Sequence, residues 1–175
     1  EQGARLTDTA AGFRTRILAA AQESIYRETD PPFIPIALFG EEAPHEVLTA
    51  DKAGTYWDLM APYVIGSGIF PSGSDEQSWL IGYLQKHGGI CMGMIRVRPT
   101  FEFWVDKSGV NDLYGLRYTL ALLQNDDVDR ALVSFYGKLA QGMAPATFAG
   151  CEASCLVPAD EYGRQLSLPP NSAAN

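Results

Sequence analysis

The chain has 175 residues, a length that suits one domain with a sizeable hydrophobic core. Its residues are 46% hydrophobic and 19% charged, a composition that excludes a wholly disordered or fibrous chain. Thirteen Lys and Arg against 21 Asp and Glu give a net charge of −8, which argues against nucleic acid or an anionic membrane as a partner. No apolar run approaches the roughly 18 residues that a membrane span needs.

Hydrophobic periodicity predicts five helices that alternate in character. The first, third and fifth, residues 7–27, 75–87 and 127–141, carry an apolar stripe on one side and polar residues on the other. The second and fourth, residues 55–66 and 111–124, are apolar almost all round. A helix that is apolar on every side has to be buried, whereas a striped helix covers it and faces water. The order outer, inner, outer, inner, outer therefore predicts helical hairpins in two concentric layers.

Irregular segments connect the predicted helices. Asp75 and Asp126 suit the N-caps of two outer helices, because a carboxylate can accept from free backbone N–H groups. Residues 31–46 are expected to be extended and broken by prolines, and residues 90–104 form an apolar loop or a short hairpin. Loops of this length are uncommon in compact domains unless they are functional, so we expect them to shape a cleft.

A five-residue pattern recurs at almost constant spacing along the chain. Its copies, residues 50–54, 105–109 and 159–163, share a small or apolar residue, Asp and a final Gly. Such spacing is the signature of stacked supersecondary units. The third copy leads into a Pro-, Asn- and Ser-rich segment with no inner helix after it, so we expect residues 1–175 to be one domain and about half of a larger closed structure. The alternative is a complete three-hairpin domain with a loose tail.

The cysteines and histidines suggest no metal site. Cys151 and Cys155 could form a disulfide or remain thiols, and Cys91 lies in an apolar run that predicts a buried thiol. His45 and His87 are far from this pair and from each other in the sequence, so a zinc site lacks ligands. We therefore expect neither a metal nor another cofactor.

The alternating helices, with three segments of sequence, resemble the six-hairpin toroid glycosidases, which include glucoamylase-like and trehalase-like enzymes. These segments are residues 56–63, 111–115 and 168–175. The resemblance implies an all-α fold, about half of an (α/α)6 toroid, with its active site in the loops that enter the inner helices. It also implies a glycoside hydrolase that acts on an oligo- or polysaccharide. The remaining toroid segment or a second copy would then be the partner, and a secreted or periplasmic location is favoured.

Four acids are candidates for this chemistry. Glycoside hydrolysis needs one carboxylic acid to protonate the leaving oxygen and a second carboxylate as base or nucleophile. Glu152, among small residues, is the first candidate, with Asp112 or Asp58 as its partner. The alternatives are a solvent-facing loop acid for Glu152, a helix cap for Asp112 and a structural pair for Asp58. Glu102 fits an outward-facing strand residue better.

Aromatic and basic residues near these acids are candidates for binding the substrate. Sugars stack their apolar faces on aromatic rings, and the candidate rings are Tyr56, Trp57, Trp104 and Tyr114. Each ring could instead belong to the hydrophobic core. Arg164 could hydrogen-bond a hydroxyl or a sugar carboxylate, or else form a salt bridge with a loop aspartate.

Two other functions stay open. A polysaccharide lyase on a similar toroid would use a Tyr or His base; His87 with Tyr114 favours it, whereas the net charge of −8 weighs against an acidic sugar. A helical-repeat scaffold would instead bind a protein on its concave face. Accessible carboxylates that converge in a cleft would indicate an enzyme, and an open apolar groove without them would indicate the scaffold.

Overall fold

Most of the chain that can be described is helical. The computed structural model describes residues 2–37, 42–48, 56–97, 109–111, 115–143, 146, 150–155 and 164–166. Its α-helices are α1 (Gln2–Ser24), α2 (Tyr56–Gly66), α3 (Asp75–Lys86), α4 (Leu116–Gln124) and α5 (Val128–Gly137), and α5 continues into a π-helix at Lys138–Gly142. The predicted, largely helical class is confirmed, and each of the five helices begins and ends within five residues of its expected ends.

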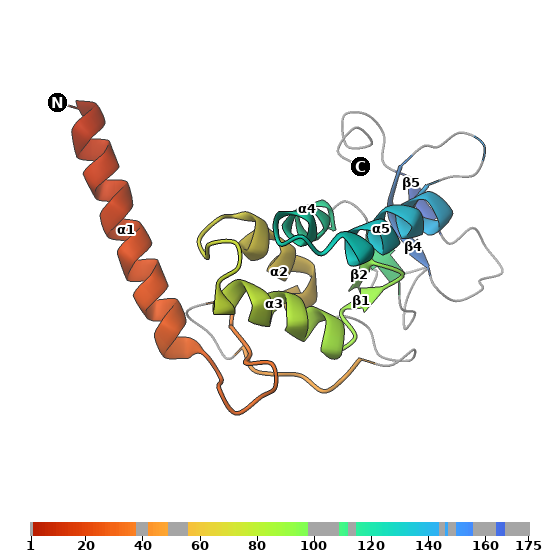
Figure 1. The fold of residues 1–175 in the computed structure, drawn as a ribbon, viewed down its shortest axis with the longest axis horizontal. Helices are drawn as coiled ribbons and strands as arrows, with labels where there is room; N and C mark the ends of the chain where they lie inside the picture. Colours follow the sequence, from red (N-terminus) through yellow and green to blue (C-terminus); the bar gives the residue numbers. More distant parts are fainter. Residues whose placement is uncertain are drawn as a thin grey trace.

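A five-stranded antiparallel sheet accompanies the helices (Figure 1). Its strands, in spatial and chain order, are β1 (Ile90–Cys91), β2 (Met94–Val97), β3 (Gly109–Asn111), β4 (Cys151–Cys155) and β5 (Arg164–Leu166). The β1–β2 hairpin confirms one of the two forms expected for residues 90–104. The other three strands lie outside that hairpin, and β3 includes Asn111, where a helix had been expected to begin. Gly109 and Asn111 are poor helix formers, so their pairing with β2 and β4 decides the local structure.

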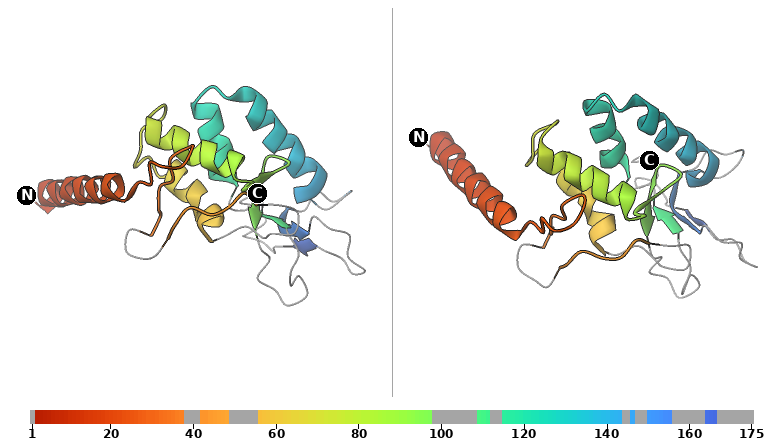
Figure 2. Two further views of the ribbon diagram at one scale, coloured as in Figure 1. Left: turned by 90° about the horizontal axis from the view of Figure 1, so that it is seen from below. Right: turned by 60° about the horizontal axis from the view of Figure 1, so that its bottom comes forward.

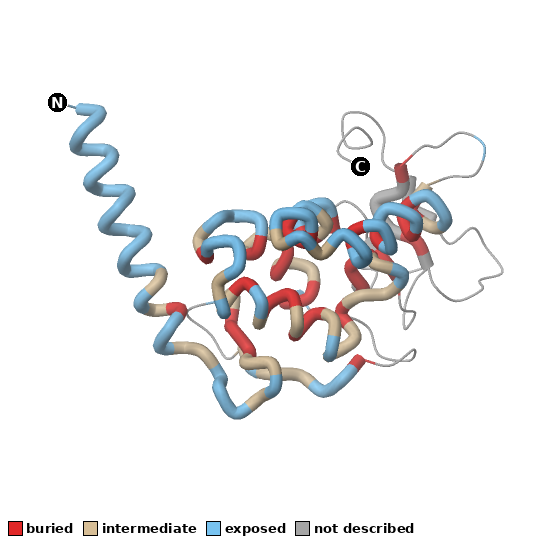
Figure 3. Tube along the Cα trace, in the orientation of Figure 1, coloured by how far each residue is buried: buried red, intermediate tan, exposed pale blue. Residues whose placement is uncertain are grey.

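The core lies where α2 meets its neighbours. This helix contacts α3, α4 and β2, and Figure 3 shows buried residues concentrated there. Large fully buried side chains include Phe33, Tyr83, Leu84, Ile95 and Tyr118. The indole Nε1 of Trp57 donates to the Ile34 carbonyl at 2.8 Å, which ties the 31–37 segment to α2. The expected burial is confirmed for α2, but α4 leaves Leu116, Leu120 and Leu123 39–49% exposed, so the prediction that it is buried on every side is wrong.

The outer helices differ from the prediction in how they face the core. Helix α1 extends away from the rest of the molecule, and Ala21 is its single buried residue (Figure 2). Helix α5 turns its apolar stripe outward, with Phe135 52% exposed, and buries Ser134 and Gly137 instead. The reason is the close approach of the β1–β2 turn, since a Cβ added to Gly93 would lie 2.4 Å from the Cα of Ser134.

Two helix caps lie one residue away from their predicted positions. The N-cap of α3 is Ser74, whose hydroxyl accepts from the backbone N–H of Gln77 at 3.3 Å, and Asp75 belongs to the first turn. The N-cap of α5 is Asp127, while Asp126 adopts a left-handed backbone with φ 57°. Asp75 interacts favourably with the dipole of α3 from its first turn, and Asp126 immediately precedes the N-cap of α5, so both lie next to a cap position.

The strand geometry does not fit a disulfide, which was one of the two states considered for Cys151 and Cys155. Cys151 and Cys155 lie four residues apart in β4, and a strand of that length separates their Cα atoms by about 13 Å. A disulfide requires Cα atoms within about 7 Å, so these two thiols cannot pair with each other in this strand. Cys91 is a free thiol at a half-buried position and not a fully buried one. The repeated five-residue segments lie outside the described residues, apart from Gly109 in β3.

Candidate functional site

Both histidines of the chain meet beside an acid and two aromatic rings. His45 comes from the 42–48 segment, Trp57 and Asp58 from the start of α2, Tyr83 from α3, and His87 from the C-cap of α3. The ring centroids of His45 and His87 are 5.9 Å apart. We call these five residues the histidine cluster. It corrects the expectation that distance in the sequence keeps the two histidines apart.

The polar centre of the cluster is a contact between His45 and Asp58. The imidazole Nε2 lies 3.4 Å from Oδ1 of Asp58, whose side chain is 0% exposed. The other ring nitrogen of His45, Nδ1, lies 2.7 Å from the Glu46 carbonyl, which can only accept. Both ring nitrogens therefore face oxygen acceptors, an arrangement that favours the imidazolium form.

The pKa values of the two histidines move in opposite directions. Burial alone lowers the pKa of His45, but Asp58 and the Glu46 carbonyl outweigh it, so the pKa is raised above 6.5. Burial lowers the pKa of His87, and the nearby positive charge of His45 and Lys86 adds to this effect. The cluster therefore stabilises the charged form of His45 and the neutral form of His87 relative to free histidines.

Tyr83 holds the two histidine segments together. Its hydroxyl accepts from the His45 backbone N–H at 3.0 Å and donates to the His45 carbonyl at 3.2 Å. Its ring stacks on His87 with a centroid distance of 3.9 Å, the contact expected for residues four apart on a helix. Burial raises the pKa of Tyr83, so its hydroxyl stays protonated and able to donate.

Backbone contacts connect the histidine cluster to the sheet. An added Cβ on Gly89 would lie 2.6 Å from Oδ1 of Asp58, so Asp58 packs directly on the backbone before β1. The backbone N–H of Arg96 in β2 donates to the Gly89 carbonyl at 2.8 Å. Arg96 pairs with Val110 of β3, which pairs with Ser154 of β4. Because neighbouring strands lie about 4.8 Å apart, β2 and β4 are separated by about 10 Å.

The three predicted catalytic acids have different outcomes. Asp58 is fully buried against His45, which agrees with the structural pairing considered for it and gives it no open surface. Glu152 lies in β4 and not in a loop, and its side chain is not described. Asp112 lies outside the described residues, but Asn111 before it pairs with Ala153, the residue after Glu152. No separation between the three carboxyl groups follows from these positions.

The predicted substrate-binding residues also divide into different groups. Trp57 is 3% exposed and belongs to the hydrophobic core, which was the alternative considered for each candidate ring. Tyr56, at the start of α2, is 72% exposed. Trp104 and Tyr114 lie outside the described residues, and Arg164 is in β5 with its side chain not described. His45 and Tyr83 are the cluster members that sequence reasoning missed. Tyr83 and His87 are four residues apart in one predicted helix, and this spacing could have indicated that their rings stack.

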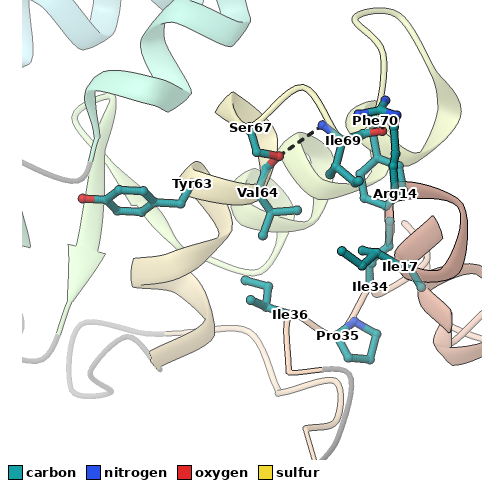
Figure 4. A pocket seen from close by; sticks show the side chains of 11 residues that line it. Arg14, Ile17, Ile34, Pro35, Ile36, Tyr63, Val64, Ser67, Ile69 and Phe70 are labelled. Atoms are coloured by element: carbon teal, nitrogen blue, oxygen red, sulfur yellow. Dashed lines mark hydrogen bonds between the residues drawn. The ribbon is translucent and has the colours of Figure 1, made fainter. Parts of the chain in front are cut away.

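A separate apolar cavity of about 400 Å³ lies between α1 and α2 (Figure 4). Ile17, Ile34, Ile36, Val64 and Ile69 are among its lining residues. Arg14 lies at this cavity, where its Nη2 donates to the carbonyls of Gly68 and Ile69 at 3.0 and 2.8 Å. No carboxylate is among the described residues that line it, so this cavity does not fit two-carboxylate chemistry.

Known proteins, possible metal ligands and helix hydropathy add three findings. Comparisons with family models, curated proteins and solved structures return no match for this chain. Within the described ranges no three His, Cys, Asp or Glu side chains gather as they would around a metal ion. None of the described helices has the length and hydropathy to cross a membrane.

Proposed function

We propose that the chain is a glycoside hydrolase domain that cleaves an oligo- or polysaccharide with Glu152 and Asp112 as its acid–base pair. The observation that carries the proposal is the register of β3 and β4. Asn111 pairs with Ala153, and these two residues are the chain neighbours of Asp112 and Glu152. A two-carboxylate mechanism requires acids from separate segments at one place, and this pairing supports that arrangement.

The two acids have distinct roles in the proposed reaction. Glu152 protonates the glycosidic oxygen as the bond to the anomeric carbon breaks, and Asp112 removes a proton from the water that attacks from the opposite face. This is the inverting route, in which the two carboxyl groups stand about 6.5 to 9.5 Å apart to leave room for the water. Asp58 takes no part in proton transfer in this proposal, because its side chain is 0% exposed and paired with His45.

The packing of the helices supports a second part of the proposal, that the chain forms about half of an (α/α)6 toroid. Helices α2 and α4, both predicted as inner, contact each other. Helix α3 packs on α2 and α5 packs on α4, as outer helices would in successive hairpins. In such a toroid β3 and β4 would lie in loops that lead to the inner layer, where the resemblance places the active site.

A polysaccharide lyase is the second candidate, and the histidine cluster favours it. A lyase needs a neutral base that removes a proton next to a sugar carboxylate. His87, whose pKa is lowered, stacks on Tyr83 beside His45, whose pKa is raised, so the charged form of His45 is favoured next to the acidic sugar. Asp58 weakens this reading, since its contact with His45 offsets the positive charge.

Enzyme kinetics of matched variants test the hydrolase proposal. A panel of neutral and acidic oligosaccharides is screened for release of reducing ends, and the active substrate is taken to single-variant kinetics. Glu152→Gln and Asp112→Asn each lower kcat by about 10²- to 10⁴-fold, the range for general acid–base groups. Glu28→Gln, which changes an exposed acid of the 25–37 segment, keeps the activity. Equal rates for all three variants would contradict the assignment of the acid–base pair.

A further inference from the structure

Helix α5 exposes an apolar stripe that no described part of the chain covers. Val128, Leu132, Phe135 and Leu139 follow one another at spacings of four, three and four residues, and they are between 38% and 52% exposed. On α4, Leu116, Leu120 and Leu123 are similarly exposed at the same kind of spacing. Two neighbouring exposed apolar stripes of this kind indicate an interaction site.

Helix α1 carries a second stripe of the same kind. Leu6, Phe13 and Ile17 are 67%, 54% and 43% exposed, and with Ala10 and Ala20 they alternate at spacings of four and three residues. That heptad spacing is the pattern of a helix that packs along another helix. The contacts of α1 with the body involve its second half, as at Arg14 and Ile17 beside the cavity of Figure 4.

We propose that two copies of this chain associate about a two-fold axis, with α1 of each copy packed on the α4–α5 face of the other. This inference rests on the proposed toroid. Helices α1 and α5 are the first and last outer helices and lie at opposite ends of the molecule, so α1 cannot cover α5 of its own chain (Figure 1). The described helices of each copy, three outer and two inner, then form one half of the ring, with two equivalent contacts between the halves.

The area and the charges of the two faces support a second copy as the occupant. The exposed fractions of the α4, α5 and α1 side chains correspond to about 1,000 Å² per copy, and a stable dimer buries about 1,200 to 2,000 Å² in total. Helix α1 has Arg5, Arg14 and Arg16 against Asp8 and Glu23, a net charge of +1, and the start of α5 has Asp126, Asp127 and Asp129 against Arg130, a net charge of −2. These charges are complementary across an α1–α5 contact and unfavourable for α5 against α5.

Sedimentation velocity of the full chain, over a concentration series, tests the dimer. The wild-type protein is expected at twice its 19.0 kDa mass. Phe13→Glu on α1 and Phe135→Glu on α5 are each expected to raise the dissociation constant about 100-fold, tenfold for each of the two symmetric contacts. Thr15→Glu is the matched control, because it puts the same charge about 200° around α1 from Phe13 and leaves the dimer intact.

The three variants separate the proposed contact from its alternatives. All three change exposed side chains, so unchanged far-UV circular dichroism and an unchanged thermal transition show that they still fold. Weakening by both Phe variants, but not by Thr15→Glu, supports α1 against α4–α5. A wild-type monomer at 100 μM, an open polymer, or sensitivity to one of the Phe variants alone would overturn the proposal. Glycosidase activity in a clear monomer would overturn the dimer and leave the proposed function standing.

Discussion

At the level of single residues, the histidine cluster makes folding stability depend on pH. The folded-state pKa of His45 is raised, so its contribution to the free energy of unfolding is complete below pH 6.5 and disappears as the pH rises through the raised value. The folded-state pKa of His87 is lowered, so its neutral form is stable above pH 6.5. Its contribution disappears as the pH falls through the lowered value, because the unfolded chain takes up the proton first.

Matched asparagine variants separate these two effects. For His45→Asn, we expect the stability difference from the wild type to shrink as the pH rises from 6 to 9. For His87→Asn, we expect that difference to shrink as the pH falls from 7 to 5. Urea unfolding followed by tryptophan fluorescence at each pH measures both. Stability differences that are independent of pH for both variants would show that neither histidine has a shifted pKa in the folded chain.

At the level of elements, α5 packs on the β1–β2 hairpin by close backbone contact. A Cβ on Gly137 would lie 1.9 Å from the carbonyl oxygen of Met92, a distance that no packed structure accommodates. On the other side of the contact, Gly93 has φ +74° and faces the backbone at Ser134. The small residues therefore belong on the inner side of α5, and its apolar stripe points outward.

Gly137→Ala tests this contact directly. We expect it to lower the free energy of unfolding by more than 2 kcal/mol, because backbone and not a flexible side chain occupies the space. Gly12→Ala in α1 is the matched control, since nothing lies within 4 Å of the added Cβ. There the same substitution raises stability by about 0.5 to 1 kcal/mol through helix propensity. Similar effects at the two glycines in urea unfolding would refute the close packing of α5 on the hairpin.

The same elements show what sequence patterns can and cannot predict. The periodicity of residues 75–87 predicted α3 almost to the residue, because a long amphipathic pattern reports local structure. The apolar stripe of α5 was also recognised, but the pattern carries no information about what covers it. Its inner face is decided by Gly93 and Gly137, which meet across 44 residues of sequence.

At the level of the whole molecule, long-range pairing accounts for most of what sequence reasoning missed. β3 and β4 are three and five residues long and pair across a separation of about 40 residues, so neither has a local pattern strong enough to predict a strand. The histidine cluster is similar, because His45 meets Asp58 and His87 through tertiary packing alone. Glu152 and Asp112 were chosen as candidates from their sequence surroundings, whereas the pairing of their chain neighbours Ala153 and Asn111 was not foreseen.

We propose that this chain hydrolyses a glycosidic bond. Proton NMR of the first products tests this proposal most directly. Incubation of the full chain with the oligosaccharide panel in D₂O should give a new anomeric signal of inverted configuration. That signal should disappear with Glu152→Gln and persist with Glu28→Gln. A vinyl proton from an unsaturated uronate would instead identify a lyase and direct attention to His87. No product from any sugar, at any concentration at which the chain is folded, would contradict the enzymatic account.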